Sequence, residues 1–166
     1  MPRGNVEAPD SGSAIALTGR SVMLVEDEAI VALAVNDSLM ELGFSVVGPF
    51  SRVSDASQAL QDCKVDAAIL DINLDGELVY SLAENLTARK IPFVFATGYG
   101  AESIEPRFEH VPVLQKPIEK DTLFRMFGML ETKGASVTNI KLHQFTATKP
   151  PPDSQEQAAV ALRLEV

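Results

Sequence analysis

The chain has 166 residues, 46% of them hydrophobic, which suffices for one compact domain with tails and leaves little room for two. It carries 23 acidic residues against 14 lysines and arginines, a formal net charge of -9 at pH 7. Contact with nucleic-acid phosphates needs clustered Lys and Arg, and no segment is such a cluster, so we expect no nucleic-acid binding.

The first 19 residues are rich in Gly, Pro and Ser, which predicts a flexible N-terminal segment. They lack the ~7–15 apolar residues of a signal-peptide core, and no run in the chain approaches the ~18 of a membrane span. Cys63 is the single cysteine, so an internal disulfide is not expected, which fits a reducing compartment. We expect a soluble, cytoplasmic protein without a membrane partner.

From residue 21 onward, short apolar runs recur at a spacing of roughly 20 residues. They are VMLV at 22–25, FSVVG at 44–48, AAIL at 67–70, FVFA at 93–96 and VPVL at 111–114. Each has the length of a strand, and the lack of polar alternation is typical of strands buried on both faces.

Segments with helical periodicity lie between these runs and after the last one. The apolar faces are Val31, Val35, Leu39 and Leu42; a weaker one at 54–62; Leu78, Leu82 and Leu86; and Leu123, Met126, Phe127 and Leu130. The segment AESIEPRFEH, before the fifth run, is short and broken by Pro106, so a stunted helix is expected there. Alternating strands and helices predict an α/β fold with a doubly wound parallel sheet and helices on both faces. The periodicity does not determine the strand order, but five strands suit the flavodoxin-like arrangement, order 2-1-3-4-5.

The pattern defines one domain over residues 20–131 and a C-terminal tail over 132–166. KPPPDSQEQ at 149–157 predicts an extended, proline-stiffened linker, and AAVALRL after Ser154 could form a short helix. The tail is either disordered or a docking or self-covering segment.

Polar residues follow four of the five runs. Glu26 and Asp27 follow the first, Asp71 the third, Thr97 the fourth and Lys116 the fifth. Because the carboxyl ends of parallel strands share one edge of the sheet, we expect these side chains to converge on one crevice.

Three converging carboxylates repel one another, so the site needs a cation, and Mg²⁺ prefers such oxygen ligands together with phosphate oxygens. A lysine ammonium and a threonine hydroxyl suit the remaining oxygens of a phosphoryl group. A carboxylate can itself be the nucleophile that forms an aspartyl-phosphate. The residue set therefore favours phosphoryl chemistry.

These motifs resemble the receiver domains of bacterial two-component response regulators, of the single-domain type, over roughly residues 20–131. The resemblance implies that Asp71 accepts a phosphoryl group from a sensor histidine kinase or a phosphotransfer protein. It implies that Glu26, Asp27, Asp71 and the backbone carbonyl of Asn73 hold Mg²⁺, and that Thr97 and Lys116 contact the phosphoryl oxygens. It also implies a cis peptide bond between Lys116 and Pro117.

The chain departs from the family pattern near the site. Val113 stands where receivers commonly place an aromatic switch residue, whereas FVFATGYG resembles a subgroup with a Phe-Ala-Thr-Gly-Tyr motif. We expect Tyr99 to act as the switch or to gate the site; the alternative is that it only covers a loop. We expect Asn73 and Tyr99 to tune the lifetime of the phosphoryl group. We expect Pro117 to be a further switch or tuning residue.

Asp71, Asn73, Asp75 and Gly76 also match the opening of an EF-hand calcium loop, but the twelfth position is Leu82 instead of a bidentate Glu. We expect Asp75 and Gly76 to turn the chain into the next helix.

Two other classes of protein are disfavoured. A phosphatase of the haloacid dehalogenase type would need a second Asp at the position of Asn73. A flavin carrier would need a hydroxyl-rich phosphate loop where Glu28 and its acidic neighbours stand.

We therefore expect a phosphoacceptor module that catalyses its own phosphorylation and slow dephosphorylation and signals by binding another protein. We do not expect it to be a metabolic enzyme. Two alternatives stay open: a phosphate shuttle or sink, and a degenerate receiver that acts without phosphorylation. His110 and His143 have no second ligand at metal-binding spacing and are expected at the surface.

Overall fold

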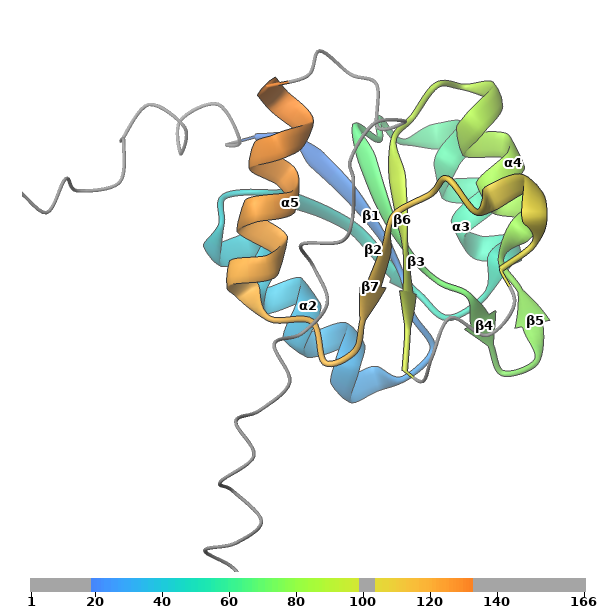
Figure 1. Cartoon of the computed structure of the whole chain (residues 1–166), viewed down its shortest axis with the longest axis horizontal. Helices are drawn as coiled ribbons and strands as arrows, with labels where there is room; N and C mark the ends of the chain where they lie inside the picture. Colours follow the sequence, from blue (N-terminus) through green and yellow to red (C-terminus); the bar gives the residue numbers. More distant parts are fainter. Residues whose placement is uncertain (1–18, 99–103, 133–166) are drawn as a thin grey trace, which may run out of the picture.

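The computed structural model describes residues 19–98 and 104–132, with side chains up to residue 127 (Figure 1). The elements in chain order are β1 Ser21–Val25, α2 Ala29–Glu41, β2 Ser45–Phe50, α3 Val53–Asp62, β3 Ala67–Asp71, β4 Asn73–Leu74, β5 Glu77–Leu78, α4 Tyr80–Ala88, β6 Phe93–Thr97, the 3₁₀ turn η1 Pro106–Phe108, β7 Val113–Gln115 and α5 Lys120–Thr132. None of the described helices has the length and apolar character needed to cross a membrane.

Five strands form one parallel sheet in the order β2-β1-β3-β6-β7. Counted along the main sheet alone, this is the order 2-1-3-4-5, so the predicted fold class is confirmed. The central strand β3 has all five residues buried because helices cover both faces. An apolar run without alternation therefore forms a strand here, as expected.

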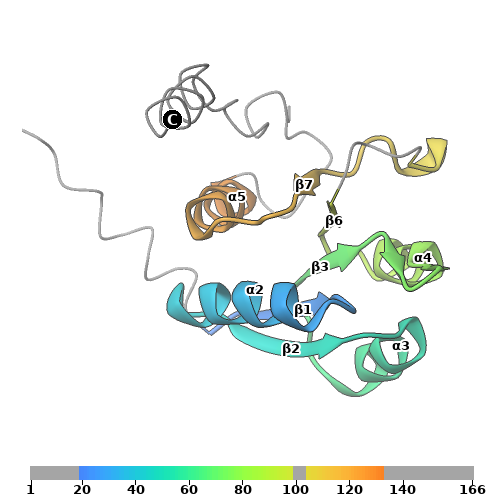
Figure 2. The same ribbon diagram turned by 90° about the horizontal axis from the view of Figure 1, so that it is seen from below.

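Helices α2 and α5 lie on one face of the sheet, and helices α3 and α4 lie on the other (Figure 2). On one face, Val35 and Leu39 of α2 and Leu123 of α5 pack against β1 and β3. On the other, the cluster includes Leu82 and Leu86 of α4 together with residues of α3, β3 and β6. The predicted apolar faces of these helices are thus buried, with Val31 and Leu42 partly so and Leu78 as the exception described next. The side chain of Leu130 is outside the described part.

The prediction for Leu78 is wrong, and the turn expected at Asp75 and Gly76 is present but leads into strand β5 before the helix begins. Leu78 belongs to β5, is 52% exposed, and precedes α4 instead of lying on its buried face. Asp75 and Gly76 have φ angles of 48° and 92° and connect β4 to β5 as an antiparallel hairpin. An Asp-Gly pair suits a two-residue hairpin loop with positive φ at both positions, so this local preference prevails over helical periodicity. Leu74 anchors the hairpin by being buried.

The segment before β7 has an aromatic anchor in place of a full helix. Within residues 104–112 the structure forms the single turn η1, in agreement with the stunted helix expected there. Phe108 is buried, and its ring centroid lies 5.5 Å from that of Tyr80 and 5.8 Å from that of Phe95. These ring contacts tie the segment to α4 and β6 and so replace the apolar stripe that a longer helix would supply.

Two strands differ most in extent from the sequence pattern: β2 spans Ser45–Phe50 where 44–48 was expected, and β7 spans Val113–Gln115 where 111–114 was expected. The edge strand β2 continues through Pro49 to Phe50, and the Gly48-Pro49 bond is cis. An edge strand tolerates proline because its outer N–H groups need no partner. Gly48 has φ of +120°, and a Cβ there would lie 2.6 Å from the carbonyl oxygen of Leu24, so the position requires glycine. The predictions for the N-terminal segment and for the tail helix lie outside the described residues.

Candidate functional site

The strand ends meet as the topology requires. Glu26 and Asp27 directly follow β1, Asp71 and Thr97 are the last residues of β3 and β6, and Lys116 directly follows β7. These four strands are neighbours in the sheet and run parallel, so the five residues lie along one edge. The backbone N–H of Lys116 donates to the carbonyl oxygen of Thr97 at 2.8 Å, which joins the ends of β6 and β7.

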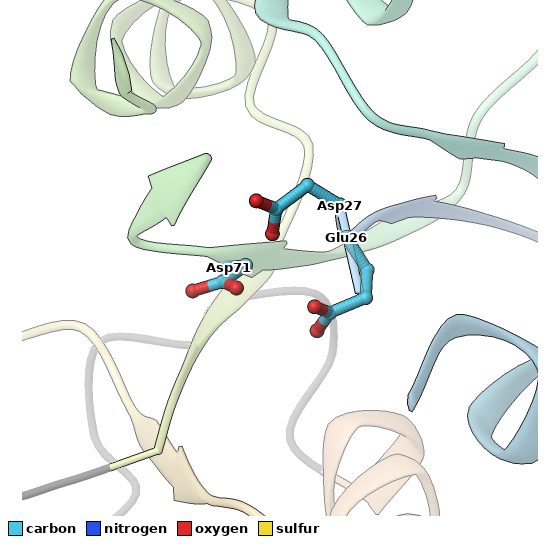
Figure 3. Close-up of side chains that lie close together, drawn as sticks. All are labelled: Glu26, Asp27 and Asp71. Atoms are coloured by element: carbon cyan, nitrogen blue, oxygen red, sulfur yellow. The ribbon is translucent and has the colours of Figure 1, made fainter. Parts of the chain in front are cut away.

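Three carboxylates form the centre of this edge (Figure 3). Glu26, Asp27 and Asp71 each offer one carboxylate oxygen, and these oxygens all lie within 4.8 Å of one another. Glu26 is 4% exposed and Asp71 is 7% exposed, whereas Asp27 is half-buried. Such a group is costly to ionise without a cation, and its oxygens are the ligands that a hard divalent ion prefers.

Lys116 supplies a cation to the cluster. Its Nζ lies 2.7 Å from Glu26 Oε2 and 2.7 Å from Asp71 Oδ2. It also lies 3.2 Å from Oε1 of Glu28, whose side chain is largely exposed. One ammonium thus faces three carboxylates, and the site keeps an excess of negative charge.

The pKa values reflect this arrangement. Burial raises the pKa of Glu26 to about 6; the hydrogen bond from Lys116 opposes the rise and the charge of Asp71 adds to it. Burial by itself lowers the pKa of Lys116, but hydrogen bonds to Asp71 and Glu26 outweigh it and raise that pKa above its ordinary value. Lys116 therefore stays an ammonium at neutral pH.

Backbone groups orient two of the carboxylates. The N–H of Asn73 donates to Asp71 Oδ1 at 3.3 Å, while Lys116 donates to the other oxygen, Oδ2, at 2.7 Å. The N–H of Glu28 donates to Glu26 Oε1 at 3.1 Å. Both oxygens of Asp71 are thus held at the carboxyl end of the most deeply buried strand.

Comparisons with known proteins agree with this geometry. The sequence profile of the response regulator receiver domain matches residues 22–127. The chain belongs to this receiver family. The match spans β1 to most of α5 and so includes every strand end described above.

Solved structures resemble this chain in fold and sequence, and a curated protein resembles it in sequence. SdrG from Sphingomonas melonis Fr1 is 40% identical, with a TM-score of 0.60, over 69% of this chain and 98% of SdrG. A BeF3-activated conformation of SdrG from Pseudomonas melonis Fr1 is 41% identical, with a TM-score of 0.59, over 66% of this chain and 94% of that one. Protein MrkE from Klebsiella pneumoniae is 34% identical over 73% of this chain and 47% of MrkE. The chain thus spans about half the length of that curated relative.

The remaining residues predicted for the receiver site are placed as follows. Thr97 is half-buried at the end of β6. Asn73 is exposed, and its Oδ1 accepts a hydrogen bond from the N–H of Gly76 at 2.8 Å. The Lys116-Pro117 bond is cis, as the resemblance implied. Tyr99 lies outside the described residues, so its switch role and the Phe-Ala-Thr-Gly-Tyr subgroup stay predictions.

Glu28 contacts the site, although the sequence did not lead us to expect it there. It reaches Lys116 through an exposed side chain at the start of α2. The signal was present as a third consecutive acid after Glu26 and Asp27, but the sequence did not show that its side chain turns toward the fifth strand.

The raised pKa of Glu26 predicts a pH dependence of stability in the metal-free receiver. Because the folded value is about 6 and the ordinary value is 4.5, the contribution is complete below the ordinary value and is lost as pH rises through about 6. The loss is on the order of 2 kcal/mol. We expect the free energy of unfolding of the wild type, minus that of Glu26→Gln, to fall by this amount between about pH 4 and about pH 7.

Denaturant titrations in the presence of a chelator measure this difference. A difference that stays flat across that pH range would show that Glu26 is not destabilised by burial. Glu41→Gln is the control, because Glu41 is an exposed glutamate that pairs with Lys120 away from the site.

Proposed function

We propose that this receiver is the phosphoacceptor module of a two-component phosphorelay and that Asp71 is the residue phosphorylated. One observation supports the proposal most strongly. The buried Asp71 carboxylate ends the central strand within 4.8 Å of two further carboxylate oxygens and 2.7 Å from the Lys116 ammonium. A nucleophile, the ligands for a divalent ion and a cation for a transferred phosphoryl group are thus gathered in one place.

In the proposed reaction a carboxylate oxygen of Asp71 attacks the phosphorus of the donor. The new O–P bond forms as the P–N bond of a phosphohistidine breaks, and the imidazole leaves with the electron pair and takes up a proton. With an acyl phosphate donor, a carboxylate leaves instead. Lys116 must release Asp71 Oδ2 to contact the phosphoryl oxygens, and Thr97 at the neighbouring strand end would donate its hydroxyl to them.

The donor set fits Mg²⁺. Glu26, Asp27 and Asp71 offer three carboxylates against the single ammonium of Lys116, and a divalent cation offsets the excess negative charge. These residues and the backbone carbonyl of Asn73 would hold the ion. Mg²⁺ would neutralise charge on the phosphoryl group during transfer.

The proposed partners are a sensor histidine kinase or phosphotransfer protein as donor and another protein as the receiver of the signal. SdrG, at 41% identity, has a BeF3-activated conformation, which supports the proposal that this chain also has an activated form. The acidic balance of the chain supports a protein partner over a nucleic acid.

Intact-mass measurement tests the proposal. After incubation with MgCl₂ and acetyl phosphate, the chain should gain the mass of one phosphoryl group, which differs from that of an acetyl group. A chelator should abolish the gain because it removes the ion. If no phosphoryl adduct forms at any Mg²⁺ concentration, the phosphoacceptor proposal fails.

A further inference from the structure

The outward face of α2 is apolar. Ile30 is 86% exposed, Leu33 60% and Met40 61%, and their spacing of three and seven residues aligns them along one side of the helix. The opposite side carries Val35 and Leu39, which are buried against the sheet. Single exposed apolar residues are ordinary, but three large ones in a row form a patch. We name Ile30, Leu33 and Met40 the α2 stripe.

The α2 stripe has an acidic setting. Helix α2 contains Asp37 and Glu41 and no basic residue, and Glu28 directly precedes it. Glu28 already pairs with Lys116 and Glu41 with Lys120, so the charge available to a partner is that of Asp37. Asp37 lies between Leu33 and Met40 along the stripe. It forms no ion pair in the part of the chain whose side chains are described and accepts only a hydrogen bond from Asn36 Nδ2 at 3.3 Å. A partner for this face should therefore combine apolar side chains with positive charge.

One segment of the chain has this composition. Residues 133–152 contain three lysines and no Asp or Glu. Their large apolar residues gather in 137–145 and are Val137, Ile140, Leu142 and Phe145, with Lys141 among them. Residues 153–166, by contrast, contain three acids and one arginine, so their net charge is the same sign as that of α2.

The segment begins within reach of the stripe. It follows α5, which ends at Thr132 and packs on the same face of the sheet as α2 (Figure 2). A return along the whole of α5 would cover about 20 Å, because that helix has 13 residues. The ten residues 133–142 span up to about 33 Å when extended, so they can cover this distance. Attachment to the same chain also gives the segment an effective concentration near the millimolar range, so weak contacts suffice.

We propose that residues 137–145 dock on the outward face of α2. Their apolar side chains cover the α2 stripe, and Lys141 provides the positive charge facing Asp37. Because α2 begins directly after Glu28, which contacts Lys116, the docked segment stands beside the phosphorylation site proposed above. Any protein that binds the outward face of α2 must displace it.

A spin label in the full-length chain tests the placement. In a Cys63→Ser background, a nitroxide at His143→Cys should cause loss of amide peak intensity along α2 and spare α3, which lies on the opposite face. Adding Ile140→Asp and Leu142→Asp should restore the α2 intensities. A loss that these two substitutions leave unchanged would mean that the segment only moves near α2, and the proposal fails.

The stripe itself offers a second variant that keeps the core intact. Leu33 is 60% exposed, so Leu33→Asp should fold and restore the α2 intensities. Leu78 of the β4–β5 hairpin is 52% exposed, and Leu78→Asp should not restore them. Mixing spin-labelled, unenriched chain with enriched, unlabelled chain separates docking within one chain from docking between copies. An equally strong loss of intensity in the mixture would overturn docking within one chain. A stripe-centred loss from a label at Ala161→Cys, without one from His143→Cys, would overturn the assignment of residues 137–145. These outcomes do not depend on whether Asp71 is phosphorylated.

Discussion

Asp71→Asn should accept no phosphoryl group from acetyl phosphate in the presence of Mg²⁺, whereas Asp75→Asn should be phosphorylated like the wild type. The amide of Asn is a poor nucleophile and carries no charge for the metal, so the substitution removes both proposed roles of the carboxylate. The fold should persist, because Lys116 keeps its contacts with Glu26 at 2.7 Å and with Glu28 at 3.2 Å.

Asp75 is a matched control. It lies four residues from Asp71 in the sequence, but it is exposed at the hairpin turn with φ of 48°. Asn adopts positive φ as readily as Asp, so Asp75→Asn changes charge without straining the turn. Intact-mass measurement of both variants decides the matter. A phosphoryl adduct on Asp71→Asn, or its loss from Asp75→Asn, would place the phosphorylation site elsewhere.

Lys116→Met should have opposite effects on metal binding and on phosphorylation. The ammonium competes with a metal ion for Glu26 and Asp71, so its removal should tighten Mg²⁺ binding by about tenfold, equivalent to about 1.4 kcal/mol. Phosphorylation should slow by about a hundredfold or more, because the variant lacks the cation proposed to stabilise the transferred group.

Metal-free Lys116→Met should also be less stable, by about 2–4 kcal/mol, because two buried carboxylates lose their shared cation. Saturating Mg²⁺ should recover most of this loss. Calorimetric titration measures the affinity, since the chain has no Trp to report binding by fluorescence. Lys120→Met is the control: Lys120 pairs with Glu41 on the exposed surface and should alter neither quantity. Unchanged Mg²⁺ affinity in Lys116→Met would rule out the competition.

The EF-hand interpretation illustrates how the sequence and the structure relate. The sequence argued against it because AAIL has the character of a buried strand and Leu82 replaces the required Glu. Both points agree with the structure, in which β3 is fully buried and Leu82 is buried in α4. The sequence did not reveal that the same residues form a hairpin, because the two-residue strands β4 and β5 are too short to produce a pattern of their own.

The periodicity and the polar strand ends of the sequence determined the fold class and the edge at which the site forms, whereas the sheet order was expected only because five such strands suit the flavodoxin-like arrangement. They did so because each strand and helix buries an apolar face of regular spacing, and because parallel strands place their carboxyl ends together. Only the tertiary structure decided three further features. These are the contacts of Lys116 with Glu26, Glu28 and Asp71, the aromatic anchor at Phe108, and the exposed face of α2. These features depend on which side chains meet across elements far apart in the chain. The local sequence pattern does not indicate which distant side chains come into contact. In α2, where apolar residues occupy both sides of the helix, the pattern also does not show which side faces the sheet.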